Sequence, residues 1–524
     1  MKKLFGTLCF IVLTVFGFSQ SVTLNPTIDA FVDNQSPSMN YGSSSYTYLE
    51  VGVKVLGRTT TVRRSFVQFD LSSIPKNAVI TSATMIFTKV NEGSDVNNSS
   101  FSIRRVDETS TQWIETNLNW NNQPLSITSD AVIVSSSNST ERIFDVKDHV
   151  SKMVSGMYAN RGWVVKRANE TVLTSGSTYK SRHTTPQPRL VVNYYIPYNL
   201  SNVVYNHASS TSSANGSINV TLANGSTSTP TYKWYTNGTT LIPSATTNQL
   251  SNVGYGWYGL KVIGSQGDTS CFAFVLGVNC QNVSINFNPG PEYVDDAVLS
   301  ELSVNSNIGS DYVLYASHFF MSPTYKNFKS LLKFRFWLDP NMTFNQANML
   351  LIGNEHNTDS RSNASQLDAV TTNWSEKSVC WFNQPTSVTT TQVLIPATTT
   401  IDENKTLNMI PFMNLWKNDN SSNHGTLFKL QSSADPTATM AFNSSDATSA
   451  SLRPTMSLNV FINNAVAGTV SSTNSIICNG STTSLSLTGY STGASFQWQK
   501  STNGTSYSNI SGATSSSYTT LAST

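Results

Sequence analysis

The sequence of 524 residues predicts an all-β protein made of several β-sandwich domains. Hydrophobic residues make up 38% and charged residues only 12%, with much of the remainder Ser, Thr and Asn. This composition is typical of sandwiches whose strands alternate a buried with a wetted side chain. Several segments also occur twice, in the same order. The chain is too long for one hydrophobic core, so we expect three or four domains.

Residues 1–19 have the pattern of a secretory signal peptide. Lys2 and Lys3 precede the apolar run LFGTLCFIVLTVFGF, and Gly17 and Ser19 place small side chains just before the expected cleavage position. No later stretch approaches the roughly 18 apolar residues of a membrane span, so no transmembrane segment is expected after signal removal. We therefore expect a secreted protein, extracellular or on the outer cell surface. The net charge of +2 gives no overall attraction to nucleic acid.

The pattern W-x-E-x4-W-x-N-Q-P is written twice, from Trp113 to Pro124 and from Trp374 to Pro385. Other segments recur in the same order, which indicates an internal repeat. They are SFVQFDLSSIP (65–75) and SLLKFRFWLDP (330–340), GWVVK (162–166) and GTLFK (425–429), PRLVVNY (188–194) and PTMSLNV (454–460), and a Val-Asp pair before N-x-G at 32–42 and at 294–309. We expect two homologous sandwich domains, at 21–197 and 283–463, in which the tryptophans of the two patterns superpose.

Smaller units follow each of these two domains. Residues 203–281 and 465–524 each show short alternating strands, Gly, Asn and Ser in the turns, and a central tryptophan, Trp234 or Trp498. This pattern is typical of an immunoglobulin-like sandwich. The last unit has about 60 residues, fewer than the roughly 100 of such a sandwich, so we expect it to be incomplete.

Alternation along the repeated strands assigns their two faces. The positions expected inside are Val67, Phe69, Leu71, Trp163 and Val165 in the first copy and Leu332, Phe334, Phe336 and Phe428 in the second. Those expected outside are Arg64, Gln68, Asp70 and Lys166 in the first copy and Lys333, Arg335 and Lys429 in the second. Val146, Val150 and Met153 stand at helical spacing within 145–156, and Gly156 ends this stretch, so one short helix is expected in each copy.

The set formed by VD…NYG, RRSFVQFDLSSIP, the tryptophan pattern, NRGWVVK and P-x-LVV resembles the DNRLRE domain, also classed as carbohydrate-binding module family 96. The resemblance covers most of 28–196, and 283–463 resembles a divergent member in which FRFWLDP replaces the FDLSSIP type. It implies jelly-roll-type sandwiches, often attached to polysaccharide-degrading enzymes, with alginate-type acidic glycans as a ligand class. Residues 203–281 resemble the SprB repeats of gliding-bacterium adhesins, and 465–524 resemble a bacterial immunoglobulin-like repeat.

The repeated tryptophan pattern has three interpretations. As scaffolding, its rings pack a long loop onto the sandwich, its Glu accepts bonds from backbone donors, and Asn-Gln-Pro closes the turn. As a ligand site, a ring stacks on a sugar. As a catalyst, Glu115 and Glu376 act as general acids, and their candidate partners are Asp107, Glu108 and Asp368. We favour scaffolding, because a glycosidase normally has one site per catalytic domain and each small domain here would need its own. No catalytic residue is expected.

Basic side chains are the strongest candidates for binding a ligand. They are Arg64, Arg104, Arg105 and Lys166 in the first copy, with Tyr41 and Trp113 as stacking platforms, and Lys333, Arg335 and Lys429 in the equivalent places of the second copy. Guanidinium groups bind planar carboxylates through two hydrogen bonds, which suits uronate sugars. The alternative is an ordinary solvated face and, for each aromatic, a packed ring.

Similarity to jelly-roll binding modules also implies a structural calcium ion. Asp33, Asp70 and Asp295 offer the oxygen ligands that calcium prefers, although the spacing of an EF-hand loop does not occur. No other cofactor is expected.

These observations favour a non-catalytic, secreted or cell-surface protein that binds an extracellular polysaccharide, with uronate-rich acidic glycans as the expected partner. One alternative is the targeting arm of a polysaccharide-degrading enzyme whose catalytic domain lies beyond residue 524. A second is an adhesin or stalk in which the sandwiches act as spacers without sugar binding. A catalytic domain downstream would favour the first alternative, and a long run of further repeats the second.

Overall fold

The computed structural model describes residues 20–56, 59–90, 100–135, 139–171, 174–224, 229–264, 268–356, 363–432, 437–463, 468–490 and 495–522. The chain divides into two compact units, 1–198 with 224–230 and 263–269, and 199–223 with 231–262 and 270–524. The expected signal peptide lies outside the described residues. Within the described ranges, no helix combines the length and the apolar character needed to span a bilayer.

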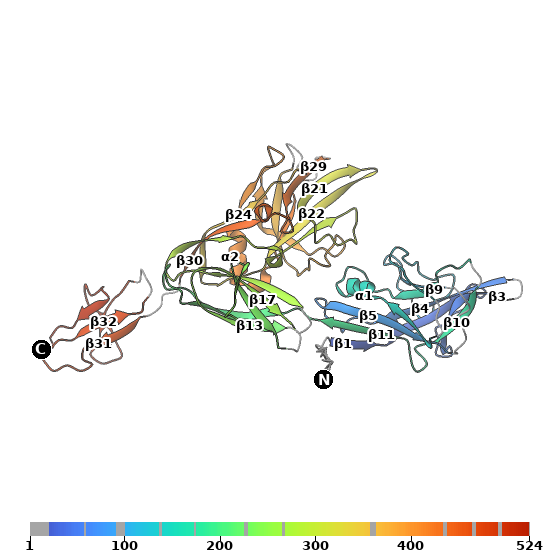
Figure 1. Ribbon diagram of the computed structural model, residues 1–524, viewed down its shortest axis with the longest axis horizontal. Coiled ribbons are helices and arrows are strands. Elements are labelled where there is room, and N and C mark those ends of the chain that lie inside the picture. Colours follow the sequence, from blue (N-terminus) through green and yellow to red (C-terminus); the bar gives the residue numbers. More distant parts are fainter. Residues whose placement is uncertain are drawn as a thin grey trace, which may run out of the picture. The chain divides into compact units, whose positions relative to one another are not determined.

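Residues 20–195 form a β-sandwich of two sheets (Figure 1, blue to teal). The smaller sheet has the strand order β1-β11-β5-β8, and the larger has the order β10-β3-β4-β9-β6-β7, with β2 also paired to β4. The elements are β1 (Gln20–Leu24), β2 (Pro26–Asp33), β3 (Tyr48–Leu56), β4 (Thr59–Phe69), β5 (Val79–Thr88), β6 (Phe101–Arg105), β7 (Val132–Val134), β8 (Glu141–Asp145), α1 (Lys147–Val154), β9 (Trp163–Arg167), β10 (Thr174–Lys180) and β11 (Arg189–Tyr195).

Alternate residues of the strands form the core between the two sheets. Val67, Phe69 and Leu71 are buried, as the alternation predicts. Trp163 of β9 is fully buried and packs edge-on against Phe69, with ring centroids 6.2 Å apart. Phe66 is buried as well, although alternation places it on the outer face. The reason is that the tryptophan loop which follows β6 packs on this outer face of the larger sheet.

The helix predicted at 145–156 is present as α1. Asp145 precedes it, and its carboxylate accepts a hydrogen bond from the backbone N–H of Lys147 at 3.0 Å. Val150 and Met153 are buried as predicted, and Gly156, with φ of +81°, ends the segment in the left-handed region that glycine tolerates. The second copy has one helix of comparable length, so the prediction of one short helix in each copy is confirmed for the described residues.

Residues 282–462 form a second sandwich with the same strand order. Its smaller sheet is β19-β30-β24-β27, and its larger sheet is β29-β21-β22-β28-β25-β26, with β20 also paired to β22. Strand by strand this repeats the first sandwich, which confirms that the two copies share one fold. The elements are β19 (Asn282–Phe287), β20 (Val294–Ser300), β21 (Val313–Met321), β22 (Thr324–Phe334), β23 (Phe336–Trp337), β24 (Met342–Leu351), β25 (Ser365–Val370), β26 (Ser387–Ile395), β27 (Lys405–Asn408), α2 (Ile410–Asn418), β28 (Thr426–Leu430), β29 (Thr437–Asn443) and β30 (Thr455–Ile462).

The strand registers show which residues of the two copies correspond. In the first copy Asp29 lies opposite Val67. In the second copy Asp296 lies opposite Leu332, the residue that matches Val67 in the sequence repeat. Asp296 is therefore the counterpart of Asp29. The expected match between the two Val-Asp pairs is wrong, because the second pair begins at Val294 and is shifted along its strand.

Residues 199–276 form two further sheets, and one of them is completed by the second copy. The strands are β12 (Asn199–Asn206), β13 (Gly216–Asn224), β14 (Thr231–Thr236), β15 (Thr240–Ile242), β16 (Gln249–Val253), β17 (Gly256–Ile263) and β18 (Thr269–Leu276), in the orders β12-β13-β16 and β15-β14-β17-β18-β23. The last strand of the five, β23, runs parallel to β18, with Ala273 opposite Phe336. β23 is the FRFWLDP segment, so its departure from the first copy coincides with this strand pairing.

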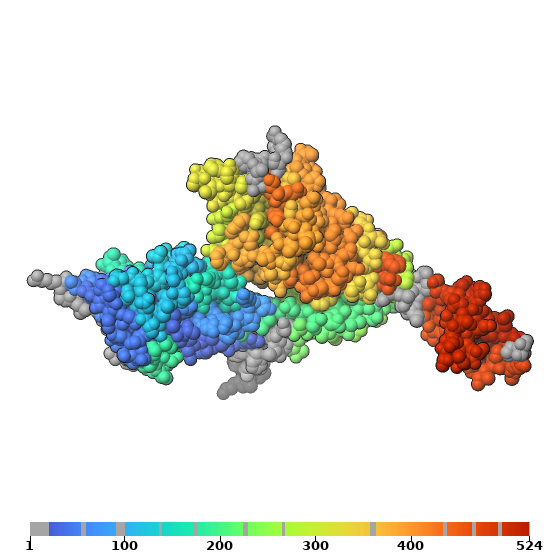
Figure 2. Space-filling view, turned by 180° about the vertical axis from the view of Figure 1, so that it is seen from behind, coloured from blue at the N-terminus to red at the C-terminus, as the bar shows by residue number. Residues whose placement is uncertain are grey.

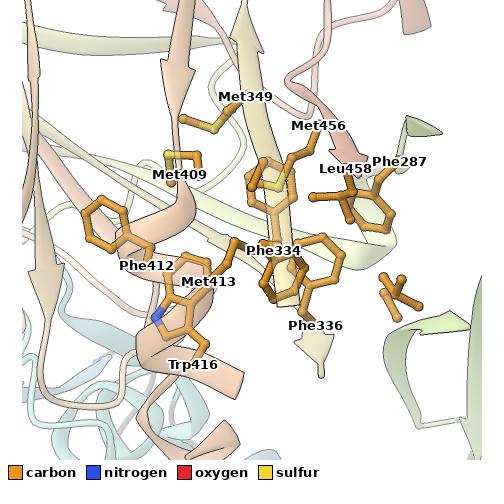
Figure 3. Close-up of a cluster of buried hydrophobic side chains, with 14 of the residues drawn as sticks. Phe287, Phe334, Phe336, Met349, Met409, Phe412, Met413, Trp416, Met456 and Leu458 are labelled. Carbon is orange, nitrogen blue, oxygen red and sulfur yellow. The ribbon is translucent and has the colours of Figure 1, made fainter. Parts of the chain in front are cut away.

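The 199–281 segment and the second copy also share one hydrophobic core. Trp257 of β17 packs edge-on against Phe287, with ring centroids 4.7 Å apart. Figure 3 shows Phe287 beside Phe334 and Phe336, and their ring centroids lie 5.8 and 4.3 Å from that of Phe287. In Figure 2 the green atoms of the segment lie directly against the yellow and orange atoms of the second copy. The two therefore pack as a single body.

A polar contact is buried in the same junction. His207 Nδ1 accepts a hydrogen bond from the backbone N–H of Gly277 at 3.0 Å, so its Nε2–H donates to Asp339 Oδ2 at 2.9 Å. The hydroxyl of Tyr205 donates to the backbone carbonyl of Trp337. These bonds fix the angle at which β23 meets the preceding strands.

Residues 468–522 form two small sheets. A three-stranded sheet contains β31 (Thr469–Ser472), β32 (Ser484–Thr488) and β35 (Ser517–Thr519), in that order, and a two-stranded sheet contains β33 (Gln499–Lys500) and β34 (Ser508–Asn509). With the four larger sheets, this makes the described chain an all-β protein with two α-helices, as the sequence predicts.

Candidate functional site

The first tryptophan of the repeated pattern anchors its loop to the larger sheet. Trp113 is only 6% exposed and packs edge-on against Phe66, with ring centroids 5.9 Å apart. Its indole N–H donates to the backbone carbonyl of Arg161 at 2.9 Å. Trp374 donates in the same way to the carbonyl of His424 at 2.8 Å. The equivalence of the two tryptophans is confirmed, and their contacts are those of a scaffold.

The glutamate of the pattern ties the same loop to the sheet. Glu115 Oε1 accepts a hydrogen bond from the backbone N–H of Asp29 at 3.0 Å, and Glu376 Oε1 accepts one from Asp296 at 3.1 Å. These bonds match the scaffolding interpretation rather than catalysis. The carboxylates considered as catalytic partners also have other contacts: Asp107 with Thr109, Glu108 with Arg105, and Asp368 with Lys429.

The N-x-G signal has a physical cause at the same place. The Asn40 side-chain amide donates to the backbone carbonyl of Glu115 at 2.7 Å. A Cβ at Gly42 would lie 2.1 Å from that carbonyl oxygen, which no side chain tolerates. Asn307 and Gly309 make the same contacts in the second copy. The motif therefore reports how closely the tryptophan loop approaches the strand.

The second tryptophan of the pattern is half-buried and lies beneath a cation. The guanidinium carbon of Arg64 is 4.7 Å from the ring centroid of Trp120, a cation–π contact. In the second copy Lys329 Nζ lies 4.7 Å from the ring centroid of Trp381. Lys329 is therefore the counterpart of Arg64. Each of the two cations directly precedes the first serine of the matched segments, so the repeat itself carried the signal that identifies Lys329.

The glutamine of the Asn-Gln-Pro turn holds each cation over its ring. Gln123 Nε2 donates to the carbonyl of Trp120 at 3.0 Å, and its Oε1 accepts from Arg64 Nη1 at 2.9 Å. Gln384 donates to the carbonyl of Trp381 at 3.0 Å and lies 3.4 Å from the nitrogen of its own cation. The turn therefore orients a charged group as well as closing the loop.

Three cations lie on the outer face of the first copy's larger sheet. Arg64 donates to both oxygens of Glu170, at 2.8 and 2.7 Å, and Lys166 Nζ lies 2.7 Å from Glu170 Oε2. Arg104, on the next strand, donates to Ser102 Oγ at 3.1 Å and forms no ion pair within the described part of the chain. We call Arg64, Lys166 and Arg104 the cationic patch. The prediction that Arg64 and Lys166 share an exterior face is confirmed.

The electrostatics of the patch reflect this excess of positive charge. Burial lowers the pKa of Lys166, and the charges of Arg64 and Arg104 act in the same direction. Burial alone would raise the pKa of Glu170, but its bonds to Arg64 and Lys166 hold that pKa below its ordinary value. One carboxylate therefore serves three cations, and a second anion at this face would be stabilised.

The second copy keeps two of the three cations and reverses the third charge. Lys329 and Lys429 stand at the places of Arg64 and Lys166. At the place of Arg104 the second copy has Asp368, which is fully buried and lies 2.6 Å from Lys429 Nζ. Burial and the charge of Lys429 both lower the pKa of Lys329.

Two other candidates of the first copy lie elsewhere. Arg105 is 3% exposed, pairs with Glu108 and Asp130, and stacks 3.5 Å from the ring centroid of Tyr158. It lies opposite the fully buried Trp163, so it faces the interior, away from the cationic patch. The ring of Tyr41 stacks on Phe31 at 4.2 Å, which covers one of its faces.

Lys333 and Arg335 do not occupy the places expected for them in the second copy. By the matched segments they correspond to Gln68 and Asp70, four and six residues after Arg64. Arg335 forms an ion pair with Asp295, and Lys333 lies opposite Asp295 in the strand pairing. The expected equivalence fails because it matched charges rather than positions in the repeat.

The carboxylates considered as calcium ligands each have another partner. Asp33 pairs with Arg63 at 2.8 Å, Asp70 accepts from the backbone N–H of Ser72 at 2.8 Å, and Asp295 pairs with Arg335. These three do not fit a shared ion. Two other groups of side chains do bring ligand atoms within 4.8 Å of one another: Asp29, Glu115 and His183 in the first copy, and Asp296, Glu376 and Asp446 in the second.

The sequence model of a family described as carbohydrate-binding module family 96 matches residues 20–194 and 292–459. A family described as a domain of unknown function (DUF8696) matches residues 466–524. No curated protein matches the chain.

Similar solved structures include three β-glucuronidases. Bacteroides uniformis β-glucuronidase 3 is 10% identical, with 46% of this chain and 28% of that chain covered and a TM-score of 0.14. For an enzyme of an uncultured Clostridium sp. the values are 11%, 53%, 46% and 0.14, and for the Ruminococcus gnavus enzyme 10%, 50%, 46% and 0.15. The chain spans less than half of each enzyme, and likeness at these TM-scores supports no conclusion.

Proposed function

The chain belongs to carbohydrate-binding module family 96, and from this premise we propose that it is an exported, non-catalytic protein whose first copy binds an acidic polysaccharide. Two regions match the family, and together they cover more than half of the chain. The signal-peptide pattern of residues 1–19 and the polar, weakly charged composition support export.

The cationic patch is the observation that carries the choice of an acidic glycan. Its members lie on β4, β9 and β6, which are consecutive neighbours in the larger sheet. Adjacent strands are about 4.8 Å apart, so the cations form a row across the sheet. A linear polymer with a carboxylate on each sugar presents a matching row of charges. Arg104 is the member that forms no ion pair in the described ranges, so it offers its guanidinium for a two-bonded contact with a uronate.

The second copy is the weaker binder in this proposal. Asp368 replaces the arginine that the first copy leaves without an ion pair, and it engages Lys429. A polyanion that approaches this face meets a carboxylate where the first copy presents Arg104. The two copies therefore differ in affinity for acidic glycans, although they share the family fold.

The experiment compares an alginate oligomer with a cellulose oligomer of equal length, using the full chain in calorimetric titrations at low and high salt. We expect alginate to bind more tightly, and added salt to weaken it, since exposed charges are screened within about 10 Å at 0.1 M. Arg104→Ala should lower alginate affinity several-fold, and Arg64→Ala/Lys166→Ala should lower it further. Lys76→Ala, an exposed cation in a turn outside the patch, is the control. Equal affinity for both sugars, or no loss in Arg104→Ala and in the double variant, contradicts the acidic-glycan proposal.

Two alternatives assign the same chain to another context. In one, the copies target a polysaccharide-degrading enzyme encoded by the same gene, and in the other they act as spacers of a surface adhesin. The β23 strand that joins the 199–281 segment to the second copy would suit a stiff spacer. A complete absence of binding to any polysaccharide on a glycan array would favour the spacer role.

A further inference from the structure

A charged cluster joins the tryptophan loop to the strand at its edge in the first copy. Asp29, Glu115 and His183 place ligand atoms within 4.8 Å of one another. Arg182 neutralises this cluster: its guanidinium donates to the two oxygens of Glu115 at 2.5 and 2.7 Å, and its backbone N–H donates to Asp29 Oδ2 at 2.6 Å. With a neutral histidine, two carboxylates and one guanidinium leave a formal charge of −1.

The second copy keeps this geometry and lacks the cation. The backbone N–H of Ser445 donates to Asp296 Oδ2 at 2.8 Å, so Ser445 holds the place of Arg182, and the next residue, Asp446, holds the place of the histidine. Asp296, Glu376 and Asp446 again place ligand atoms within 4.8 Å of one another. In the ranges that the structure describes, none of these three carboxylates forms an ion pair. Their formal charge is −3.

We propose that the second copy binds a calcium ion between Asp296, Glu376 and Asp446. A divalent cation brings the charge of the cluster from −3 to −1, the value that the guanidinium gives the first copy. The ion would thus perform for the second tryptophan loop the task that Arg182 performs for the first.

The carboxylates themselves indicate that a counter-charge is missing. Without a cation, burial raises the pKa of Asp296 to about 7 and that of Glu376 to about 8, and neighbouring carboxylates act in the same direction. Burial also raises the pKa of Asp446. Arg335 acts on Glu376 in the opposite direction, but it is already paired with Asp295.

Ser445 supplies an independent observation. Its side chain is 1% exposed, and its hydroxyl faces the carboxylate of Asp296, yet among the described residues Ser445 Oγ has no hydrogen-bond partner. An unpaired buried hydroxyl costs about 1–3 kcal/mol. As an oxygen ligand beside three carboxylates, this hydroxyl would be satisfied by a bound cation.

The ligand atoms favour calcium over other metals. The cluster offers carboxylate and hydroxyl oxygens and no nitrogen or sulfur, which excludes the usual donors of zinc. Calcium takes six to eight oxygens in a flexible geometry, whereas magnesium demands a near-ideal octahedron and gives up its water reluctantly. Glu376 and Asp446 are only partly buried, so water can complete the coordination shell.

Calorimetric titration of the full chain, stripped with a chelator, tests the proposal with calcium chloride and magnesium chloride as probes. We expect one calcium ion per chain and weaker binding of magnesium. At a hundredfold excess of calcium over the dissociation constant, the melting temperature of the second copy should rise by roughly 5 °C. Asp446→Asn should weaken calcium binding at least tenfold, whereas Asp402→Asn, an exposed carboxylate outside the cluster, should not change it.

Exchange of residues between the copies decides the matter even if Asp446→Asn folds poorly. Ser445→Arg/Asp446→His imports the first copy's pair, and it should lose calcium binding while it melts in chelator at least as high as the calcium-loaded wild type. Arg182→Ser/His183→Asp should create a second calcium site in the first copy. No calcium-dependent heat in the wild type, a stoichiometry of two in the wild type, or unchanged binding in Ser445→Arg/Asp446→His would each overturn the proposal.

Discussion

The two copies have the same strands, the same tryptophan loop and the same glycine contact, but they balance their charges differently. The first copy places Arg104 and Arg182 where the second has Asp368 and Ser445. Neither position belongs to the repeated tryptophan pattern. The comparison shows that the pattern specifies how a loop is attached to a sheet, whereas residues outside it determine the charge that each copy presents.

The largest expected difference concerns the buried ring of the loop. Trp113→Ala should lower the free energy of unfolding of the first copy by about 3–5 kcal/mol, because the ring is buried and its N–H is bonded. Trp374 is only half-buried, so Trp374→Ala should cost less, about 2–3 kcal/mol. Urea unfolding measures both, and Leu125→Ala, 71% exposed in the same loop, is the control. Equal losses would mean that the two loops are packed equally well.

The next effect is a pH dependence of the first copy. Burial raises the pKa of Asp29 to about 7. Between pH 4 and 7 the folded state then holds a proton that the unfolded state has released, so the stability of the first copy falls as pH rises, by up to about 4 kcal/mol. Asp29→Asn should remove this slope in unfolding measurements from pH 4 to pH 8. Asp70→Asn, an exposed carboxylate, should leave the slope in place.

A smaller difference separates the two equivalent lysines. Lys166→Ala removes a member of the cationic patch, and we expect about a tenfold loss of alginate affinity, equivalent to about 1.4 kcal/mol. Lys429→Ala should change alginate affinity less than threefold and should instead destabilise the second copy, since it leaves the buried Asp368 without its cation. The two variants are compared by titration and by melting. A larger affinity loss in Lys429→Ala would reverse the assigned roles of the copies.

The smallest effect comes from exchanging the cations over the second tryptophan. Arg64→Lys keeps the charge over Trp120 but loses one of the two bonds to Glu170, so it should destabilise the first copy by about 1 kcal/mol. Lys329→Arg should be neutral or slightly stabilising, because arginine stacks well on an indole ring. Thermal unfolding of both variants checks this. Destabilisation by Lys329→Arg would show that the second site has no room for a guanidinium group.

Much of the fold follows from sequence patterns that act over short distances. The period of two along 65–71 places Val67 and Phe69 inside because neighbouring side chains of a strand point to opposite faces. The same rule places Arg104 and Arg105 on opposite faces, so they cannot both belong to an exterior patch. Only the strand register decides which of them faces outward, and the register depends on Trp163, far along the chain.

Other features have no local signal. Arg182 meets Glu115 across 67 residues of sequence, and Ser445 meets Asp296 across 149, so only the folded sandwich brings these residues together. The β23 strand has two residues, too few for any periodicity. The segment that contains it looked like a worn copy of the first repeat, whereas its sequence suits its contacts with the preceding strands.

The donated strand β23 has a consequence for how this protein can be taken apart or recombined. A cut between residues 281 and 282, where the repeat begins, would pass through one continuous core and leave Phe287 and Phe336 without the packing of Trp257. The preceding segment would in turn lose the edge strand of its five-stranded sheet. The smallest portable piece that contains the second copy is therefore 199–463. Grafted into another protein, this piece would carry its own fixed spacer.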